Sequence, residues 1–361
     1  MKLLMLSPAE SVHTQRWCKA LSQRGINVVL FSFSASKSSF YKECGITVYS
    51  CDINAHTIWQ KKAYLFTLRK LCNVIRRERP NIVHAHRASS YGLLGALSGF
   101  HPFIISIWGE DIYEFPRKSF IFRLLLKFAL RKADCLLSTS YVMAKEAAKY
   151  TNKSFSITPF GVDTKLFSPM NIASKDQFVI GNVKILDYRY GIDVLIRAFN
   201  LVVLANPNKK LLLRIIGDGP CREKYESLTV KLGIKDKVEF LGKIPNDNLP
   251  KYYNSFSVSV FVSISNSESF GVVAVESMSC GCPVVTSDAD GFTEVVEDGI
   301  TGIIVPKKNE QKTAEAIQTF IDNPSLRDTM GKAGRERVLK LFDWNDNVNT
   351  MLKVYNSLLK S

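Results

Sequence analysis

The sequence has no apolar run long enough to cross a bilayer, because charged residues interrupt every run before the roughly 20 residues that a helical span needs. Its first residues, MKLLMLSPAE, lack the longer apolar core and the cleavage site of a signal peptide. Its eight cysteines lack the spacing of a disulfide framework, and no repeat at solenoid spacing is present. These absences argue against membrane-spanning, disulfide-rich and repeat proteins, and we expect a reducing, cytoplasmic setting.

Acidic residues are scarce in the first half of the chain. Residues 1–165 hold 24 Lys and Arg but only 10 Asp and Glu, a net charge of +14, whereas residues 166–361 hold 24 against 23. This asymmetry indicates that the first half faces a polyanion or an anionic membrane, and a merely solvated basic surface is the alternative. We expect no nucleic-acid partner, because aromatic residues are not interleaved with basic ones on exposed strands.

Short apolar strands and amphipathic helices alternate along the whole chain. In the first half, the strand KLLMLS precedes a helix over residues 11–23, and the segment ITPFGVDTKLFSP then marks the exit from a domain. The rhythm restarts at FVIGNV. This alternation predicts an α/β fold of two doubly wound parallel sheets, over residues 1–165 and 176–342. Ligands of such folds bind at the carboxyl ends of the strands, so we expect the site in an interdomain cleft.

Two carboxylates flank the apolar stretch ESFGVVAVE, residues 268–276. We expect Glu268 on the loop after a strand and Val272 to Glu276 at the start of a helix, whose first amides can bind a phosphate. Carboxylates accept well from vicinal sugar hydroxyls. The pattern therefore suits a ligand with hydroxyls on both sides of an anionic centre, as in a sugar nucleotide. The alternative is an ordinary helix N-terminal charge at Glu268 and a solvated Glu276.

Two cations, Lys184 and Arg189, flank the turn between the first strand of the second domain and its helix. Such a pair could neutralise a diphosphate and stabilise it as a leaving group. Either residue alone could equally be a solvated loop cation.

These segments resemble the donor-binding core of the retaining GT-B glycosyltransferases of family 4. The likeness rests on ESFGVVAVESMSCGCPVV and DGFTEVVEDGITG, and it extends through ITPFGVD, YGIDVLIRAF, IIGDGP, VEFLGKIP and FDWND. It covers essentially the whole chain. The resemblance implies a GT-B fold of two Rossmann-like domains. Residues 1–165 would bind the acceptor and face a membrane, residues 176–342 would bind a nucleotide sugar, and residues 343–361 would form a helix packing back on the first domain.

The resemblance also implies roles on the donor side. Glu276 would hold the nucleotide ribose, and Glu268 would contact the donor sugar and stabilise the reacting face. Lys184 and Arg189 stand where the family usually places an arginine and a lysine at the diphosphate, and Arg189 departs from that pattern. Further backbone contacts are implied for Ile244 at the nucleobase and for Ser269, Phe270, Gly271 and Val272. Such enzymes need no metal, and we expect neither a metal nor another cofactor.

The acceptor side departs further from the family. The segment SPAESVHTQRW lacks the Gly-Gly pair of many relatives, which leaves His13 and Arg16 as polar candidates. In SIWGEDIYEFP, a tryptophan stands where many relatives have a catalytic histidine, so Asp111 becomes the candidate that positions the acceptor hydroxyl. The remaining acceptor candidates are His86, Trp108 and Glu110. A metal site at His84 and His86 is disfavoured, because no third ligand is apparent.

Two basic helices are expected in the first domain. The helix over residues 117–133 has no acid, and its Arg123, Lys127 and Arg131 recur every four residues; residues 60–79 are similarly basic. Such helices can lie on an anionic membrane, and a core helix with a solvated stripe is the alternative for residues 117–133.

Taken with the resemblance, these features predict a metal-independent retaining hexosyltransferase. We expect it to move a hexose from a nucleotide sugar, a UDP-sugar rather than a GDP-sugar, to a glycan acceptor carried on a lipid. The setting would be the synthesis of a cell-surface polysaccharide, lipopolysaccharide or capsule, by a peripheral protein on the inner face of the cytoplasmic membrane. A GT-B sugar-nucleotide epimerase is the alternative.

Overall fold

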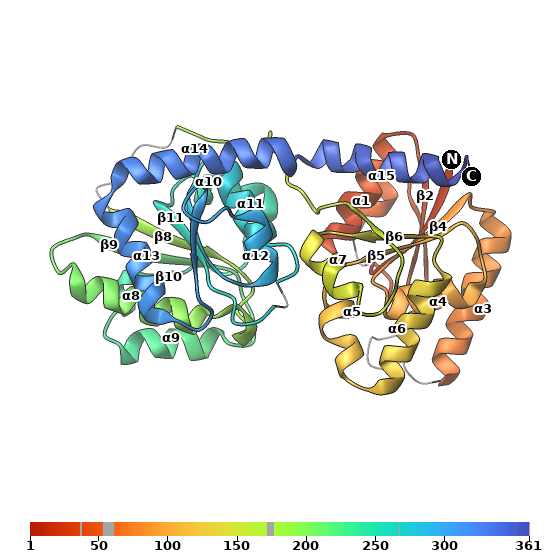
Figure 1. Cartoon of the computed structure of the whole chain (residues 1–361), viewed down its shortest axis with the longest axis horizontal. Helices are drawn as coiled ribbons and strands as arrows, with labels where there is room; N and C mark the ends of the chain where they lie inside the picture. The colour runs from red at the N-terminus through yellow and green to blue at the C-terminus, as the bar shows by residue number, and fades with distance from the viewer. Residues whose placement is uncertain (37, 53–60, 172–176, 267, 361) are drawn as a thin grey trace. The chain divides into compact units, whose positions relative to one another are not determined.

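The computed structural model describes residues 1–36, 38–52, 61–171, 177–266 and 268–360, with the backbone alone for residues 61–65. The chain divides into two compact units (Figure 1). Unit 1 comprises Met1–Pro159 and Asp346–Ser361, and unit 2 comprises Phe160–Asn345. The boundary between them therefore falls within the segment ITPFGVDTKLFSP. The expected start of the second domain, residue 176, lies outside the described residues.

Unit 1 is built on a seven-stranded parallel sheet with the order β3-β2-β1-β4-β5-β6-β7. Its strands are β1 (Lys2–Leu6), β2 (Asn27–Ser32), β3 (Thr47–Ser50), β4 (Ile82–His86), β5 (Phe103–Ile107), β6 (Cys135–Ser138) and β7 (Phe155–Ile157). Its helices are α1 (Val12–Gln23), α2 (Phe40–Glu43), α3 (Lys61–Glu78), α4 (Ser90–Ser98), α5 (Glu110–Tyr113), α6 (Phe120–Lys132) and α7 (Tyr141–Ala147), together with most of α15 (Trp344–Leu358).

Unit 2 repeats the plan with a six-stranded sheet in the order β10-β9-β8-β11-β12-β13. Its strands are β8 (Phe178–Val183), β9 (Leu211–Ile216), β10 (Val238–Phe240), β11 (Val258–Phe261), β12 (Val284–Ser287) and β13 (Gly302–Val305). Its helices are α8 (Ile192–Ala205), α9 (Arg222–Lys231), α10 (Leu249–Tyr253), α11 (Val272–Ser279), α12 (Asp290–Val295), α13 (Glu310–Asp322) and α14 (Pro324–Leu341). The prediction of two doubly wound parallel sheets is thus confirmed.

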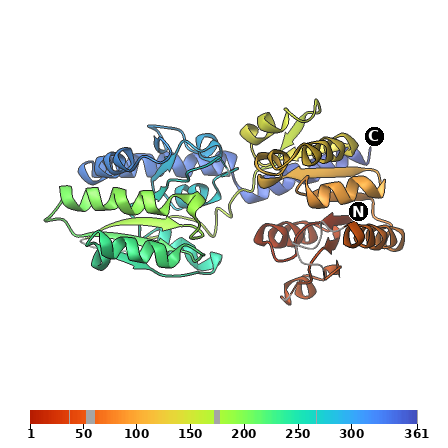
Figure 2. The ribbon, with the colours of Figure 1, turned by 90° about the horizontal axis from the view of Figure 1, so that it is seen from below.

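Helices cover both faces of each sheet (Figure 2). This explains why the central strands read as unbroken apolar runs instead of alternating ones. In β1, Leu3, Leu4, Met5 and Leu6 are all fully buried, and in β11 so are Val258 and Val260. Each unit has its own apolar core. The core of unit 1 includes the large side chains of Phe31 and Phe103, and the core of unit 2 includes those of Phe199 and Phe320.

The last helix of the chain completes unit 1. Most of α15 belongs to this unit, and its Tyr355 is fully buried there. The Tyr355 hydroxyl lies 2.7 Å from Nδ1 of His84 on the central strand β4. The core of unit 1 is therefore built from both ends of the chain.

The two basic helices of unit 1 differ in detail from the prediction. The expected helix over residues 117–133 begins later than predicted: α6 starts at Phe120, and a separate 3-10 turn, Phe115–Arg117, precedes it. The helix begins after Ser119, whose hydroxyl caps α6 by accepting the Phe122 amide at 3.2 Å. The other helix is α3; residue 60 of the predicted range lies outside the described residues.

Candidate active site

Each sheet reverses its strand order at one point of its own, and several of the sequence-predicted residues follow the strands there. In unit 2 the order runs outward from the neighbouring strands β8 and β11, and in unit 1 it runs outward from β1 and β4. Loops that leave the carboxyl ends of two such strands diverge to opposite faces of the sheet, which opens a crevice suited to a ligand. In unit 2, Lys184 follows β8, and Glu268 lies on the loop between β11 and α11.

Glu268 and Lys184 form an ion pair across the two loops of unit 2. Lys184 Nζ lies 2.5 Å from Glu268 Oε2, and both side chains are largely buried, with exposed fractions of 15% and 10%. Lys184 Nζ also lies 4.5 Å from the centre of the Tyr190 ring, a cation–π distance. Glu268 is therefore a largely buried carboxylate that a lysine holds beside the end of the sheet.

The loop from Lys184 to Gly191 is fixed tightly against the loop after β11. The Ile264 amide donates to the Arg189 carbonyl at 2.9 Å. Gly191 has a φ of +64°, and a Cβ atom there would lie 2.1 Å from the carbonyl oxygen of Val262. Only glycine fits this approach, so the backbone itself sets the separation between Lys184 and the Glu268 loop.

Arg189 is partly committed within its own loop. Its Nε lies 3.0 Å from Asp187 Oδ1, and its backbone amide donates to the same oxygen at 3.0 Å. Burial raises the pKa of Asp187, but these bonds and the guanidinium charge outweigh burial, so the pKa is lowered overall. The two expected cations are thus brought into one loop, and Lys184 is the one that reaches Glu268.

Glu276 is buried on α11 and held by two side chains from the segment before β11. Its exposed fraction is 4%. The Tyr253 hydroxyl donates to Oε2 at 3.0 Å, and the Asn246 amide donates to Oε1 at 3.1 Å. Burial together with the Glu276 charge raises the pKa of Tyr253 well above its ordinary value, so the phenol stays a donor. Glu276 is therefore oriented as a carboxylate with fixed lone pairs, and the alternative of a solvated residue is wrong.

The segment between the two glutamates contains a tight turn and the first residues of α11. Gly271 adopts a φ of +84° before the first helical residue, Val272. Phe270 is buried, with its ring against Phe160 and Phe342, and so anchors the turn, while Ser269 is half-buried. The first amides of α11 have no helical carbonyl to bind, as at any helix start. These amides can serve an anion.

Ile244, expected at the nucleobase, lies in the segment between β10 and α10 and is half-buried. Asn246 from the same segment bonds Glu276, so this segment does border the carboxylate. Ile244 thus lies in the same short segment as Asn246, the residue whose side chain donates to Glu276.

In unit 1, a hydroxyl–imidazole chain lies at the ends of β1 and β4. Ser7 Oγ lies 2.7 Å from Thr14 Oγ1 and 2.9 Å from His86 Nδ1. His86 is fully buried, and burial followed by the charges of its neighbours places its pKa well below the ordinary value, so its ring is neutral. Its Nε2 has no hydrogen-bond partner among the described residues.

Trp108 joins two of the expected acceptor residues. Its ring lies 4.5 Å from the His86 ring and 5.9 Å from the His13 ring, centre to centre. Arg16, one turn further along α1, is half-buried. Trp108 is thus part of an aromatic cluster at the end of the sheet.

Asp111 braces two loops. Its carboxylate is almost fully buried and accepts three backbone amides, from Ala88 at 2.6 Å, Trp108 at 3.1 Å and Gly109 at 2.8 Å. Burial raises its pKa, and the three amide bonds oppose that rise. Both carboxylate oxygens are therefore engaged by the backbone. Glu110 is exposed and lies 3.6 Å from Arg87.

Several residues of these sites were not predicted from the sequence. They are Ser7, Thr14, Tyr190, Asn246, Tyr253 and Ser263, the last of which lies 3.4 Å from Glu268 Oε2 through its hydroxyl. Most are ordinary polar residues in loops, short turns or helices, and no sequence pattern marks them. The exception is Tyr190, because it stands in the same short turn as the two cations that were singled out.

Neither metal-ligand clusters nor spanning helices were found in the part of the chain that the structure describes. No group of three or more His, Cys, Asp or Glu side chains there is arranged to hold a metal ion. No described helix combines the length and the apolar character needed to traverse a bilayer.

Comparisons with known proteins concern the family and the fold of the chain. Residues 164–337 match the family model of glycosyl transferases group 1, and residues 2–140 match that of glycosyl transferase 4-like proteins. The chain belongs to the group 1 glycosyltransferases. The expected family resemblance is thus confirmed.

Relatives and solved structures extend the likeness over nearly the whole chain. An uncharacterized glycosyltransferase of Methanocaldococcus jannaschii is 29% identical over 82% of this chain and 81% of its own. The phosphatidylinositol N-acetylglucosaminyltransferase gpi3 subunit of Schizosaccharomyces pombe is 25% identical over 94% and 76%. The structure of Anabaena HepE in complex with UDP matches with a TM-score of 0.83 at 19% identity, over 99% of this chain and all of that one. At such identity this structural likeness establishes the GT-B fold.

Proposed function

We propose that this glycosyltransferase moves a hexose from a nucleotide sugar to a hydroxyl of a glycan acceptor, with retention of the anomeric configuration. The observation that carries the proposal is the pair of buried carboxylates in unit 2. Glu268 is paired with Lys184, and Glu276 is oriented by Tyr253 and Asn246, on either side of the first amides of α11. A sugar, a diphosphate and a ribose would meet these groups in that order.

The donor's own charge provides most of the chemistry in this proposal. The bond between the anomeric carbon and the diphosphate oxygen breaks, and a nucleoside diphosphate leaves. Lys184, Arg189 and the first amides of α11 stabilise the charge that develops on the leaving oxygen. The acceptor oxygen bonds the anomeric carbon on the same face, and its proton passes to the departing phosphate. Glu268 stabilises the positive charge that builds up on the sugar ring.

A UDP-sugar is the favoured donor. The Anabaena protein has been solved in complex with UDP and with UDP-glucose, and its fold matches this chain along its length. In this chain, Ile244 would meet the nucleobase through its backbone. Ser269, Phe270, Gly271 and Val272 would contact the sugar and the diphosphate.

Unit 1 would bind a lipid-linked acceptor at an anionic membrane. The Schizosaccharomyces pombe relative is, by its name, a phosphatidylinositol N-acetylglucosaminyltransferase subunit, and the first 165 residues of this chain carry a net charge of +14. His13, Arg16, His86, Trp108 and Glu110 would contact the acceptor. Asp111 would position it by holding the loop amides of Trp108 and Gly109. The enzyme would work as a peripheral protein on the cytoplasmic face, in the synthesis of a cell-surface polysaccharide.

Metal independence follows from this scheme, since Lys184 and helix amides take the place of a cation at the diphosphate. Transfer or hydrolysis is therefore expected to continue in excess EDTA. A loss of activity that added Mg²⁺ or Mn²⁺ restores would contradict this part of the proposal.

A panel of nucleotide sugars tests the proposal directly. We expect one or more UDP-hexoses, and not GDP-hexoses, to raise the melting temperature of the purified protein and to be hydrolysed slowly without an acceptor. The Glu268→Gln variant should lose hydrolysis, whereas Glu315→Gln, which changes an exposed carboxylate on α13, should retain it. Stabilisation by no nucleotide sugar would contradict the proposal. Release of an epimerised sugar without an acceptor would favour an epimerase.

A further inference from the structure

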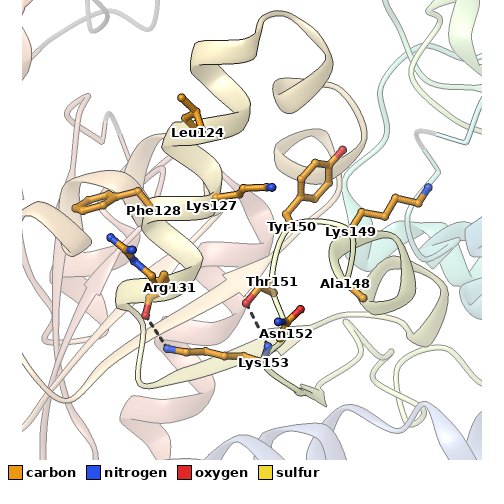
Figure 3. Close-up of a pocket in the computed structure, with 10 residues that line it drawn as sticks. All are labelled: Leu124, Lys127, Phe128, Arg131, Ala148, Lys149, Tyr150, Thr151, Asn152 and Lys153. Carbon is orange, nitrogen blue, oxygen red and sulfur yellow. Dashed lines mark hydrogen bonds between the residues drawn. The ribbon is translucent and has the colours of Figure 1, made fainter.

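A basic pocket lies in unit 1 between the second half of α6 and the segment that follows α7. Its volume is about 740 Å³. The residues that line it are Leu124, Lys127, Phe128, Arg131, Ala148, Lys149, Tyr150, Thr151, Asn152 and Lys153 (Figure 3). Four of the ten are cations and none is an acid. Such a lining selects for an anion.

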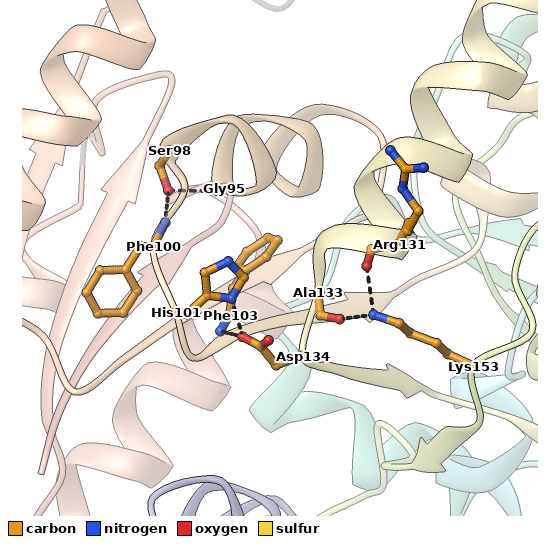
Figure 4. Close-up of polar contacts among 9 residues, drawn as sticks. All are labelled: Gly95, Ser98, Phe100, His101, Phe103, Arg131, Ala133, Asp134 and Lys153. Carbon is orange, nitrogen blue, oxygen red and sulfur yellow. Dashed lines mark hydrogen bonds and ion pairs between the residues drawn. The ribbon is translucent and has the colours of Figure 1, made fainter. Parts of the chain in front are cut away.

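Two of the four cations are already engaged and shape the wall of the pocket. The Lys153 ammonium donates to the backbone carbonyls of Arg131, at 2.7 Å, and Ala133, where it neutralises the negative end of α6 (Figure 4). Lys149 is paired with Glu146 at 2.5 Å. The Lys153 bonds tie the segment after α7 to the end of α6, so the pocket does not depend on a free loop.

The other two cations are available to a ligand. Lys127 and Arg131 are exposed, and neither has an ion-pair partner among the residues described here. They lie one turn apart on α6, and Lys127 extends from the helix toward Tyr150 (Figure 3). Figure 3 draws the Arg131 guanidinium turned away from the Lys127 ammonium, so the two meet one anion only when the exposed Arg131 side chain turns toward the pocket. A guanidinium and an ammonium one helical turn apart can then both contact the oxygens of a phosphate group, and Asn152 adds a neutral donor.

The same face of α6 becomes apolar toward its start. Phe120, Ile121 and Leu124 have exposed fractions of 70%, 65% and 49%, which is unusual for three large apolar side chains on one helix end. Phe120, Leu124, Lys127 and Arg131 follow the helical spacing of one face. An occupant of this face must therefore join an anionic group to an apolar body, which is the chemistry of an anionic phospholipid and not of a free phosphate.

We propose that the pocket of Lys127 and Arg131 binds the phosphate of an anionic phospholipid headgroup, while Phe120, Ile121 and Leu124 enter the acyl region beside it. The proposal deepens the proposed function, on which its biological meaning rests, by naming the site through which unit 1 meets a membrane. It also predicts that membrane binding depends on where the charges lie as well as on how many there are.

Vesicle sedimentation of the full chain tests the proposal. The vesicles contain phosphatidylcholine with 30% phosphatidylglycerol or phosphatidylcholine alone, and neither a sugar nucleotide nor an acceptor is present, so the outcome is independent of the proposed reaction. We expect the protein to bind the vesicles that contain phosphatidylglycerol and not those of phosphatidylcholine alone, and we expect added salt to weaken this binding. The double variant Lys127→Gln/Arg131→Gln should reduce the partition coefficient at least tenfold. Lys19→Gln/Lys42→Gln, with the same loss of charge on exposed lysines that do not line the pocket, should reduce it less than threefold.

Further arms separate the alternatives. Phe120→Ser/Ile121→Ser leaves the charge unchanged and should also reduce vesicle binding at least fivefold, because the apolar contact is lost. If Lys127→Gln/Arg131→Gln and Lys19→Gln/Lys42→Gln reduced vesicle binding equally, the proposal would be overturned in favour of diffuse electrostatic attraction. Inorganic phosphate that stabilises the protein in a manner dependent on Lys127 and Arg131, without vesicle binding, would overturn it in favour of a free anion. Retention on a single-stranded oligonucleotide without vesicle binding would overturn it in favour of a nucleic acid.

Discussion

The ammonium of Lys184 lies 2.5 Å from the carboxylate of Glu268, and this ion pair links the loops that follow β8 and β11. The lysine is therefore neutralised before any donor arrives. Under the proposed function, a diphosphate that binds here would compete with Glu268 for the same ammonium, and the sugar that it carries would then receive the released carboxylate. We therefore expect binding of the donor and exposure of Glu268 to be coupled through Lys184.

This coupling makes an unusual prediction for Glu268→Gln. We expect the variant to bind UDP more tightly than the natural protein, by a few-fold, because Lys184 no longer has to leave a carboxylate. Its turnover should fall by a factor of about 10² or more, since the stabilising negative charge is gone. Isothermal titration with UDP and a hydrolysis assay measure the two effects separately. Weaker UDP binding in the variant would contradict the coupling.

Lys184→Met is the complementary test. Hydrogen bonds to charged groups contribute about 1.5–3 kcal/mol, so the loss of this cation should weaken UDP binding by about one to two orders of magnitude. Uridine without phosphates should bind equally to both proteins. A similar loss with uridine would mean that Lys184 supports the fold of the site instead of the diphosphate.

Tyr253 is expected to act through Glu276. Tyr253→Phe removes the hydroxyl that donates to Glu276 Oε2 but keeps the buried ring. We expect UDP affinity to fall about fivefold, which corresponds to about 1 kcal/mol for one hydrogen bond. The preference for UDP over 2′-deoxy-UDP should shrink as well, because the carboxylate is no longer held for the ribose. Tyr252→Phe, at the half-buried neighbouring position, is the matched control and should change neither value. An unchanged preference in Tyr253→Phe would separate this tyrosine from ribose recognition.

Gly191 should tolerate no side chain. Both Gly191 and Gly233 have a positive φ, but an added Cβ meets a backbone oxygen at 2.1 Å only at Gly191, and nothing within 4 Å at Gly233. Gly233→Ala should cost about 1–2 kcal/mol of stability from its backbone conformation alone. Gly191→Ala should cost about 4 kcal/mol or more, because the loop must move away from Val262. Urea unfolding measures both, and equal effects would show that the two loops are not fixed as the structure has them.

The stability of unit 1 should depend on pH through His84. Burial lowers the pKa of His84 from 6.5 to about 3, so the folded protein keeps the ring neutral while the unfolded chain takes up a proton below pH 6.5. Unfolding therefore binds a proton in this range, and stability falls as the pH decreases, by about 1.4 kcal/mol per pH unit for this group. His84→Gln retains polar contacts to Ser106 and Tyr355 without the titration. Between pH 6.5 and 5, the free energy of unfolding of this variant, measured by urea unfolding, should therefore decrease less steeply than that of the natural protein, by about 1.4 kcal/mol per pH unit. Identical slopes in both proteins would contradict the prediction.

The fold was largely predictable from the sequence because its signals are local. Unbroken apolar strands such as KLLML and amphipathic helices such as residues 12–23 need only their own residues to be recognised. The late start of the predicted helix 117–133 was missed, because it depends on whether Ser119 caps a helix or continues one.

The candidate site was predictable in part. Glu268 and Glu276 stood out because they flank an apolar stretch at a strand-to-helix junction. Lys184 and Arg189 stood out because they flank the turn between the first strand of the second domain and its helix. Tyr253 and Asn246 did not, since their role arises from a contact with Glu276 across 23 and 30 residues of sequence. Asp111 shows the opposite difficulty. Its residue type suggested contact with an acceptor, whereas its three bonds to backbone amides are visible only in the structure.

The contact between Tyr355 and His84 has a consequence for how the protein is made. A ribosome finishes β4 and the rest of the first sheet long before it reaches α15, and the residues of unit 2, Phe160–Asn345, are translated in between. At about 5–20 residues per second, that interval lasts roughly 10 to 40 seconds. During this interval, the imidazole of His84 lacks its contact with the Tyr355 hydroxyl. Unit 1 can therefore complete its core only after α15 has been translated, whereas all residues of unit 2 are translated before α15 is complete.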